Sequence, residues 1–171
     1  FIVDPHKWLF APFDSCALIY ANPAVARRTH TQDAGYLDVI HQGEGWNPGD
    51  YAHQLTRRAR GLPLWFSLCV HGTDAYRAAV QASIDLTARV VAEIEGCDYM
   101  ELVRDPSLSI VLWRRVGWVH ADYERLQHRL LDAQAAFVTP TVWEGETVGR
   151  FAFIHPATTM EMVREVIDAC R

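Results

Sequence analysis

The sequence predicts an α/β fold that ends in a small α+β domain. Two observations carry this prediction. Short apolar runs typical of buried strands stand near the start of the chain, and an apolar stripe with helical spacing follows at about residues 73–95. Beyond Gly96, strand and helix patterns alternate, which is typical of a small α+β domain. We therefore expect one domain part over residues 1–96 and a small domain over residues 97–171.

The first elements are two short strands joined by a turn. Phe1 to Val3 are apolar and lead into the turn pair Asp4-Pro5. Cys16 to Ala21 form a second β-like run, which Asn22-Pro23 ends. Lys7 is therefore expected on a turn between two buried strands.

A long segment at about residues 29–61 differs in composition from the residues before it. It is rich in glycine and histidine and has no sustained periodicity. A stretch this long without regular structure is uncommon in a compact domain, and when it is ordered it is usually a lid or a binding loop. A flexible surface excursion explains the composition equally well.

A long helix is expected next. After the apolar run from Leu62 to Leu68, Thr73 can cap a helix that continues to about Glu95, and Gly96 provides its stop. The inward-facing residues of this helix are expected to be Ala79, Val80, Ile84, Leu86, Val90, Val91 and Ile94.

The C-terminal domain is expected to contain two strands and two helices. The strands fall at 108–113 and 150–154, and a helix runs from 122 to about 137 between them. The capping box Thr158-Thr159-Met160-Glu161 opens the last helix. The inward-facing residues are expected to be Leu126, Leu130 and Leu131 on the first helix, and Val163, Val166, Ile167 and Cys170 on the second.

Composition excludes several classes of function. The net charge of −5 and the pI near 5.9 leave no basic footprint for nucleic acid or for an anionic membrane surface. No apolar run approaches the roughly twenty residues that span a bilayer, and no signal-peptide pattern is present. We expect a cytoplasmic protein. The four cysteines are far apart and are expected to be small buried hydrophobes.

The start of the chain suggests a longer protein. Phe1-Ile2-Val3 has no methionine and no polar leader before it, and such a run is typical of the middle of a strand. We expect the chain to be the C-terminal part of a larger polypeptide.

Lys7 is the only lysine among sixteen basic residues. A lysine amine that loses its proton can attack a carbonyl and form a Schiff base, whereas arginine stays charged. Apolar neighbours, namely Phe1, Ile2, Val3, Leu9 and Phe10, would desolvate the amine and favour its neutral, nucleophilic form. The alternative is a lysine at a strand end that reaches into water.

Two further groups of residues can carry chemistry. The basic run from Thr56 to Arg60 can hold a phosphate or a carboxylate, or it can be a solvated charge cluster. The eight histidines form no HxxxH or HExxH pair, so no metal site is expected. The P-loop, GxGxxG and GxSxG motifs are also missing from the sequence.

Two motifs together resemble a known family. Asp4-Pro5-His6-Lys7-Trp8, followed by Phe13-Asp14-Ser15-Cys16, is similar to the cofactor-lysine segment of the pyridoxal-phosphate-dependent group II amino-acid decarboxylases. The run from Arg57 to Trp65, followed by His71-Gly72, looks like that family's Arg-Arg-x-Arg-x-Leu-x-x-Trp motif. The resemblance is strong to about Gly72 and continues only in pattern beyond it. It implies the C-terminal part of a fold-type I pyridoxal-phosphate-dependent transferase-like fold.

The resemblance also implies roles for five residues. Lys7 would hold pyridoxal phosphate as a Schiff base, and His6 would adjoin the cofactor. Tyr36 matches a lid tyrosine that protonates the substrate carbon after CO₂ leaves, which favours decarboxylation over oxidative deamination. Asp4 stands where relatives often carry a phosphate-contacting asparagine, and this departure puts its direct contact with the phosphate in doubt. Thr56 matches a residue that reaches the phosphate site of the neighbouring subunit, which implies a homodimer with its active site at the interface.

By the same resemblance, other parts of the site lie upstream of the lysine segment. These are the ring-stacking histidine, the acidic partner of the pyridine nitrogen and most of the phosphate cup. The expected function is decarboxylation of an L-amino acid to a primary amine and CO₂, with little or no activity of this chain alone. The alternatives are another fold-type I activity, such as an aldehyde-forming deaminase or a carbon–carbon lyase, and a non-catalytic truncated chain.

Overall fold

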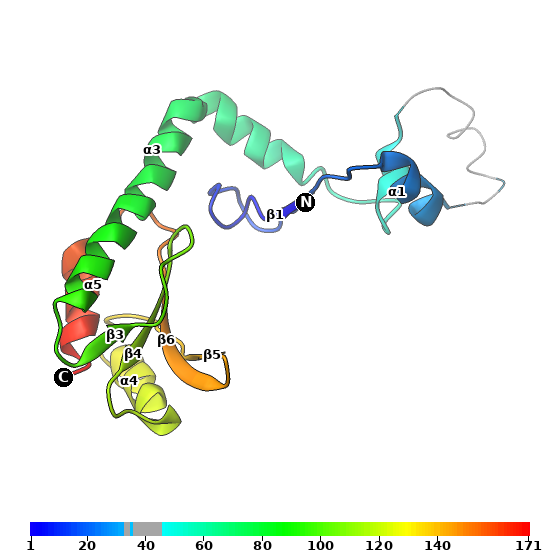
Figure 1. Cartoon of the computed structure of the whole chain (residues 1–171). Coiled ribbons are helices and arrows are strands. Elements are labelled where there is room, and N and C mark those ends of the chain that lie inside the picture. The colour runs from blue at the N-terminus through cyan, green and yellow to red at the C-terminus, as the bar shows by residue number, and fades with distance from the viewer. Residues whose placement is uncertain (33–34, 36–45) are drawn as a thin grey trace. The chain divides into compact units, whose positions relative to one another are not determined.

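The structure is a computed structural model that describes residues 1–32, 35 and 46–171. The chain divides into two compact units, Phe1–Val70 and His71–Arg171, and each is described by itself (Figure 1). The domain boundary predicted after residue 96 differs from this division of the chain and stays a prediction. Within the described residues, no helix is long and apolar enough to cross a membrane.

The first unit begins with a small antiparallel hairpin. Strand β1 (Ile2–Val3) pairs with β2 (Ala17–Leu18), and Ile2 lies opposite Leu18. Both strands lie inside the runs that predicted them, although β2 is shorter than the predicted run to Ala21. The backbones of Phe1 and Ile19 exchange two hydrogen bonds of 2.9 Å and extend the pairing.

A short helix that the sequence analysis did not predict follows. Asn22 caps α1 (Pro23–His30), because its side chain accepts a hydrogen bond from Ala24 N and Pro23 occupies the first turn. The Asn22-Pro23 pair thus ends a strand and starts a helix. Further on, the 3₁₀ helix η2 (Pro48–Tyr51) contacts α1, and Arg27 pairs with Asp50 at 3.2 Å. The predicted long loop therefore contains regular structure near its end.

The helix α3 (Gly61–Glu95) is longer than predicted. Gly72, with φ 75° and ψ 162°, interrupts it, and the predicted helix at 73–95 is the part beyond this glycine. The part before Gly72 includes the apolar run from Leu62 to Leu68, which was not assigned because a short apolar run fits a strand or a helix equally. The helix stops where Gly96 was predicted to end it, and the Gly96 N–H bonds Ala92 O at 3.1 Å.

The second unit contains a four-stranded antiparallel sheet. Its strands are β3 (Met100–Leu102), β4 (Ile110–Arg115), β5 (Thr141–Trp143) and β6 (Glu146–Ala152), in the spatial order β3-β4-β6-β5. The two long strands, β4 and β6, were predicted, with shifted bounds. The two edge strands were not, because three residues carry too little alternation to be recognised.

Helices cover the core face of this sheet. The α4 helix (His120–Asp132) and α5 (Met160–Asp168) pack with the C-terminal part of α3, beside which α5 lies in Figure 1. Thr159 caps α5, since its side chain accepts a hydrogen bond from Met162 N. The core includes Val90, Ile94, Val111, Trp113, Leu126, Leu130, Phe151, Val163, Val166, Ile167 and Cys170.

Three predictions for the second unit and the cysteines were wrong. Leu131 is 42% exposed, because it lies one residue after the inward-facing Leu130 and so points to another side of α4. The same helix ends at Asp132 rather than near Phe137, and Gln134 follows with a φ of 54° that is incompatible with helix. Among the cysteines, Cys16 and Cys69 are exposed rather than buried.

Candidate active site

Lys7 lies at the turn that joins β1 to β2. Its backbone N–H donates to Asp4 O at 2.9 Å, and Ala11 N donates to Pro5 O at the same distance. Pro5 and Ala11 are buried, so the base of the turn is packed while Lys7 is exposed. The local sequence thus presents one amine on a hydrogen-bonded turn, as predicted.

The amine of Lys7 is paired with Asp4. The distance from Nζ to Asp4 Oδ2 is 2.6 Å, and the two side chains are 63% and 29% exposed. The hydrogen bond from Lys7 holds the pKa of the Asp4 carboxyl below its usual value. Asp4 is therefore engaged by the Lys7 ammonium in this structure.

The predicted desolvation of Lys7 by its apolar neighbours is wrong for this structure. Phe1 and Ile2 are 80% and 64% exposed, so they point away from a packed interior and do not shield the amine. The hairpin has only two paired residues on each strand, which is too small to enclose a side chain at its turn. Lys7 is instead held by a charged partner in contact with water.

His6 is held against the returning strand of the hairpin. Its Nδ1 lies 2.5 Å from Ser15 O and 3.2 Å from Ser15 N, and its ring meets the Phe13 ring edge-on at 5.1 Å. The imidazole next to Lys7 is therefore oriented by the fold.

Cys16 completes the polar group around Asp4. Its thiol hydrogen-bonds to the Asp4 carboxylate, which further lowers the pKa of Asp4. Partial desolvation and then this hydrogen bond raise the pKa of the Cys16 thiol. Asp4 thus faces an ammonium and a thiol, with the imidazole of His6 near enough to act on its charge.

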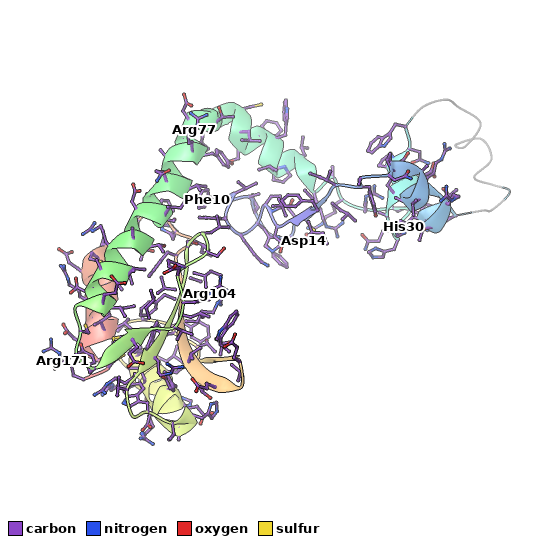
Figure 2. All side chains as sticks on the ribbon, in the orientation of Figure 1. Phe10, Asp14, His30, Arg77, Arg104 and Arg171 are labelled. Atoms are coloured by element: carbon purple, nitrogen blue, oxygen red, sulfur yellow. The ribbon has the colours of Figure 1, made fainter. Side chains whose placement is uncertain are left out.

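Asp14 connects the two sequence motifs. Its Oδ1 accepts a hydrogen bond from Arg58 at 2.6 Å, and its Oδ2 accepts one from Arg60 Nε at 2.9 Å. The Asp14 side chain is labelled in Figure 2. The hydrogen bond from Arg60 is the largest cause that lowers the pKa of Asp14. The basic run is therefore partly neutralised by the hairpin and is not only a solvated cluster.

This relationship was missed by the sequence analysis. The only signal was an acid in the first motif and several arginines in the second, and the chain has 21 acidic residues that could pair with them. A hollow of about 390 Å³ lies beside the junction. Its lining comes from both motifs and from the start of α3, namely Pro12, Phe13, Asp14, Arg58, Ala59, Arg60, Leu62, Pro63 and Phe66.

Thr56 and Tyr36 are the other two predicted site residues. Thr56 is exposed on the segment between η2 and α3. Tyr36, the predicted proton donor, lies outside the described residues. No group of three or more metal-ligating side chains occurs in the described part of the chain.

One protein-family model matches the first two thirds of the sequence. The family model described as "Pyridoxal-dependent decarboxylase conserved domain" matches residues 1–116. This range includes both motifs, the whole hairpin and the Asp14 junction. The match therefore covers every described residue of the candidate site.

Individual relatives cover nearly all of the chain. It is 28% identical over 174 residues to an aromatic-L-amino-acid decarboxylase of Bacillus atrophaeus, with 96% of this chain and 36% of the relative covered. It is also 28% identical, over 149 residues, to a 3,4-dihydroxyphenylacetaldehyde synthase of Aedes aegypti, with 85% and 28% covered. The chain thus spans about a third of the length of these curated relatives.

A solved structure shows the same fold. The crystal structure of Oryza sativa TDC with PLP and tryptamine matches 99% of this chain and 38% of its own, with a TM-score of 0.85 and 22% identity. The similarity confirms the predicted α/β fold, which matches part of that larger structure.

Proposed function

Because this chain belongs to the pyridoxal-dependent decarboxylase family, we propose that it supplies the cofactor-anchoring lysine, Lys7, of an enzyme that decarboxylates an L-amino acid to a primary amine and CO₂. The observation that carries the proposal is the exposed amine of the only lysine, held on a hydrogen-bonded turn inside the family match. The Asp14 junction supports it, because it ties the lysine hairpin to the second motif.

The described residues fit pyridoxal phosphate at its aldehyde end. The Lys7 side chain is 63% exposed, so its amine can reach an aldehyde, and His6 beside it has a fixed ring. When bound, pyridoxal phosphate supplies a ring that accepts the electrons of the broken carbon–carbon bond. Lys7 would anchor the group covalently and His6 would adjoin it. Asp4 is engaged by Lys7 in this structure, which argues against a direct role on the phosphate.

Two roles depend on residues that the described structure does not connect to Lys7. We propose that Tyr36 donates a proton to the substrate carbon after CO₂ has left. We also propose that Thr56 acts in a homodimer, where it would contact the phosphate site of the neighbouring subunit. A phenylalanine at position 36 tests the first proposal, and cross-linking of the assembled protein tests the second.

Reductive trapping tests the central assignment. The protein is incubated with pyridoxal 5′-phosphate, reduced with borohydride, digested and mapped by mass spectrometry. We expect one phosphopyridoxyl group on Lys7 and its loss in Lys7→Arg, which keeps the charge but cannot form the adduct. An adduct at any other residue, with Lys7 unmodified, overturns the proposal.

The aldehyde-forming relative supports a second candidate reaction. An amine with CO₂ as products indicates decarboxylation, whereas an aldehyde with ammonia indicates oxidative deamination. Aromatic amino acids are the first substrates to test, because the relatives compared here include an aromatic-L-amino-acid decarboxylase. With Tyr36 present we expect the amine, and Tyr36→Phe should shift products toward the aldehyde.

The chain alone is expected to have little or no activity. By the resemblance to the family, the acidic partner of the pyridine nitrogen lies before the lysine segment, and the ring is a poor electron sink without it. Release of CO₂ at an enzyme-like rate by the isolated 171-residue chain with added pyridoxal phosphate would contradict this expectation.

A further inference from the structure

The ion pair between Asp4 and Lys7 has a consequence for cofactor capture. Two contacts define it: Lys7 Nζ lies 2.6 Å from Asp4 Oδ2, and Lys7 N donates to Asp4 O at 2.9 Å. The buried Pro5 fixes the backbone between the two residues. The turn itself therefore places the carboxylate beside the amine.

The charges around Asp4 all favour its ionised form. Lys7 and Cys16 donate hydrogen bonds to its carboxylate, and His6 adds a smaller Coulombic effect. These are the titratable groups that act on Asp4 from the turn and from the returning strand. Asp4 thus presents a full negative charge to the Lys7 amine at neutral pH.

A charged partner opposes the chemistry that the amine must perform. An amine adds to an aldehyde through its nitrogen lone pair, which the protonated ammonium lacks. In the reaction, the neutral amine adds to the aldehyde carbon, two N–H protons leave with the carbonyl oxygen as water, and a carbon–nitrogen double bond forms. No oxidant or reductant is needed. The proton held in the ion pair must be released first.

We propose that Asp4 is a positioning residue that holds Lys7 as an ion-paired ammonium in the cofactor-free protein and thereby slows its capture of the cofactor aldehyde. The inference rests on the proposed function, because it requires Lys7 to be the anchoring amine. The carboxylate has an effect that an asparagine at this position would lack, since an uncharged amide does not stabilise an ammonium.

The test compares capture rates in wild type, Asp4→Asn and Asp4→Glu. Asp74→Asn is the matched control, because Asp74 and Arg77 form an exposed ion pair of the same i,i+3 spacing on α3, at 2.9 Å. Each protein is mixed with pyridoxal 5′-phosphate or with pyridoxal, which has no phosphate. Samples are reduced with borohydride at set times, and the adduct on Lys7 is quantified by mass spectrometry, separately from any adduct on the Phe1 amine.

Near pH 7.5 we expect Asp4→Asn to capture both aldehydes about two to five times faster than wild type, the size expected for an exposed ion pair. Asp4→Glu and Asp74→Asn should stay near the wild-type rate.

Each other outcome overturns the inference in a distinct way. Equal or slower capture by Asp4→Asn shows that the carboxylate does not hold the amine back. Acceleration with pyridoxal 5′-phosphate but not with pyridoxal shows that Asp4 acts on the phosphate instead. Adducts away from Lys7 in every variant contradict the proposed function itself, so the two failures are distinguishable.

Discussion

The carboxylate of Asp14 lies 2.9 Å from Arg60 Nε, although 46 residues separate the two in sequence. Asp14 belongs to the hairpin that carries Lys7, and Arg60 ends the basic run of the second motif. A second bond, from Arg58 to the other carboxylate oxygen, makes the contact a bridge of two charge-assisted hydrogen bonds. The two motifs that characterise the family are thus parts of one physical junction.

Asp14→Asn is expected to loosen the basic run. The amide loses the negative charge that both arginines contact, so the backbone around Arg58 and Arg60 should open more often. Limited digestion with trypsin should cut after these arginines several-fold faster than in wild type. Asp74→Asn, which removes an exposed ion pair on α3, is the control and should leave cleavage there unchanged. Equal cleavage in both variants would show that the bridge does not restrain this segment.

Gly149→Ala is expected to destabilise the second unit by about 1–3 kcal/mol or more, the typical cost of overpacking. A Cβ at position 149 would lie 2.2 Å from the ring of Trp113, which is fully buried on the neighbouring strand. Hydrogen exchange of the β4 peptide in increasing urea measures the change. Gly61→Ala, whose Cβ meets open space, is the control. The double variant Gly149→Ala/Trp113→Phe has a smaller ring beside the new Cβ, so it should recover part of the lost stability.

Glu93 should make the stability of the second unit depend on pH. Its carboxylate accepts two hydrogen bonds from Arg164, at 3.1 and 3.0 Å, and these hold the pKa of Glu93 below its usual value. A depressed pKa contributes stability above the unfolded-state value of about 4.3, and the contribution is lost as the pH falls through the folded-state value.

Glu93→Gln should therefore be less stable than wild type at pH 7 and should approach it near pH 3. Protection of the β4 peptide against hydrogen exchange, measured across this range, reports the difference. Glu95, two residues further on, is exposed, so protection in Glu95→Gln should depend on pH in the same way as in wild type. If the difference in protection between Glu93→Gln and wild type stayed the same at every pH, the titration of Glu93 would be excluded as the cause of that difference.

The cysteines should react with iodoacetamide in a defined order at pH 8. Cys69 is exposed and should be alkylated first. Cys16 is exposed but its raised pKa leaves less thiolate, so it should react more slowly. Cys170 is fully buried, and burial raises its pKa to about 12, so it should react only after denaturation. Labelling of Cys170 in the native protein, followed by peptide mapping, would contradict the described core.

Sequence reasoning identified the elements whose signals are local. The helix beyond Gly72 and the inward residues of α5 were predicted, because helical spacing acts within a few residues. The predicted capping box places the cap of α5 at Thr158, whereas Thr159 caps it one residue further on. The Asn22-Pro23 pair shows the limit of such signals. The pair predicts the end of a strand, but the same residues also cap and start α1.

The sequence by itself determined that this chain carries a single lysine, Lys7, inside a turn, and two motifs that resemble one family. Only the tertiary structure decided that Asp14 meets Arg60 and that the Lys7 side chain is largely exposed. The physical reason is range. Turns and helices follow from interactions between near neighbours, but a contact across 46 residues depends on the whole path of the chain between its ends.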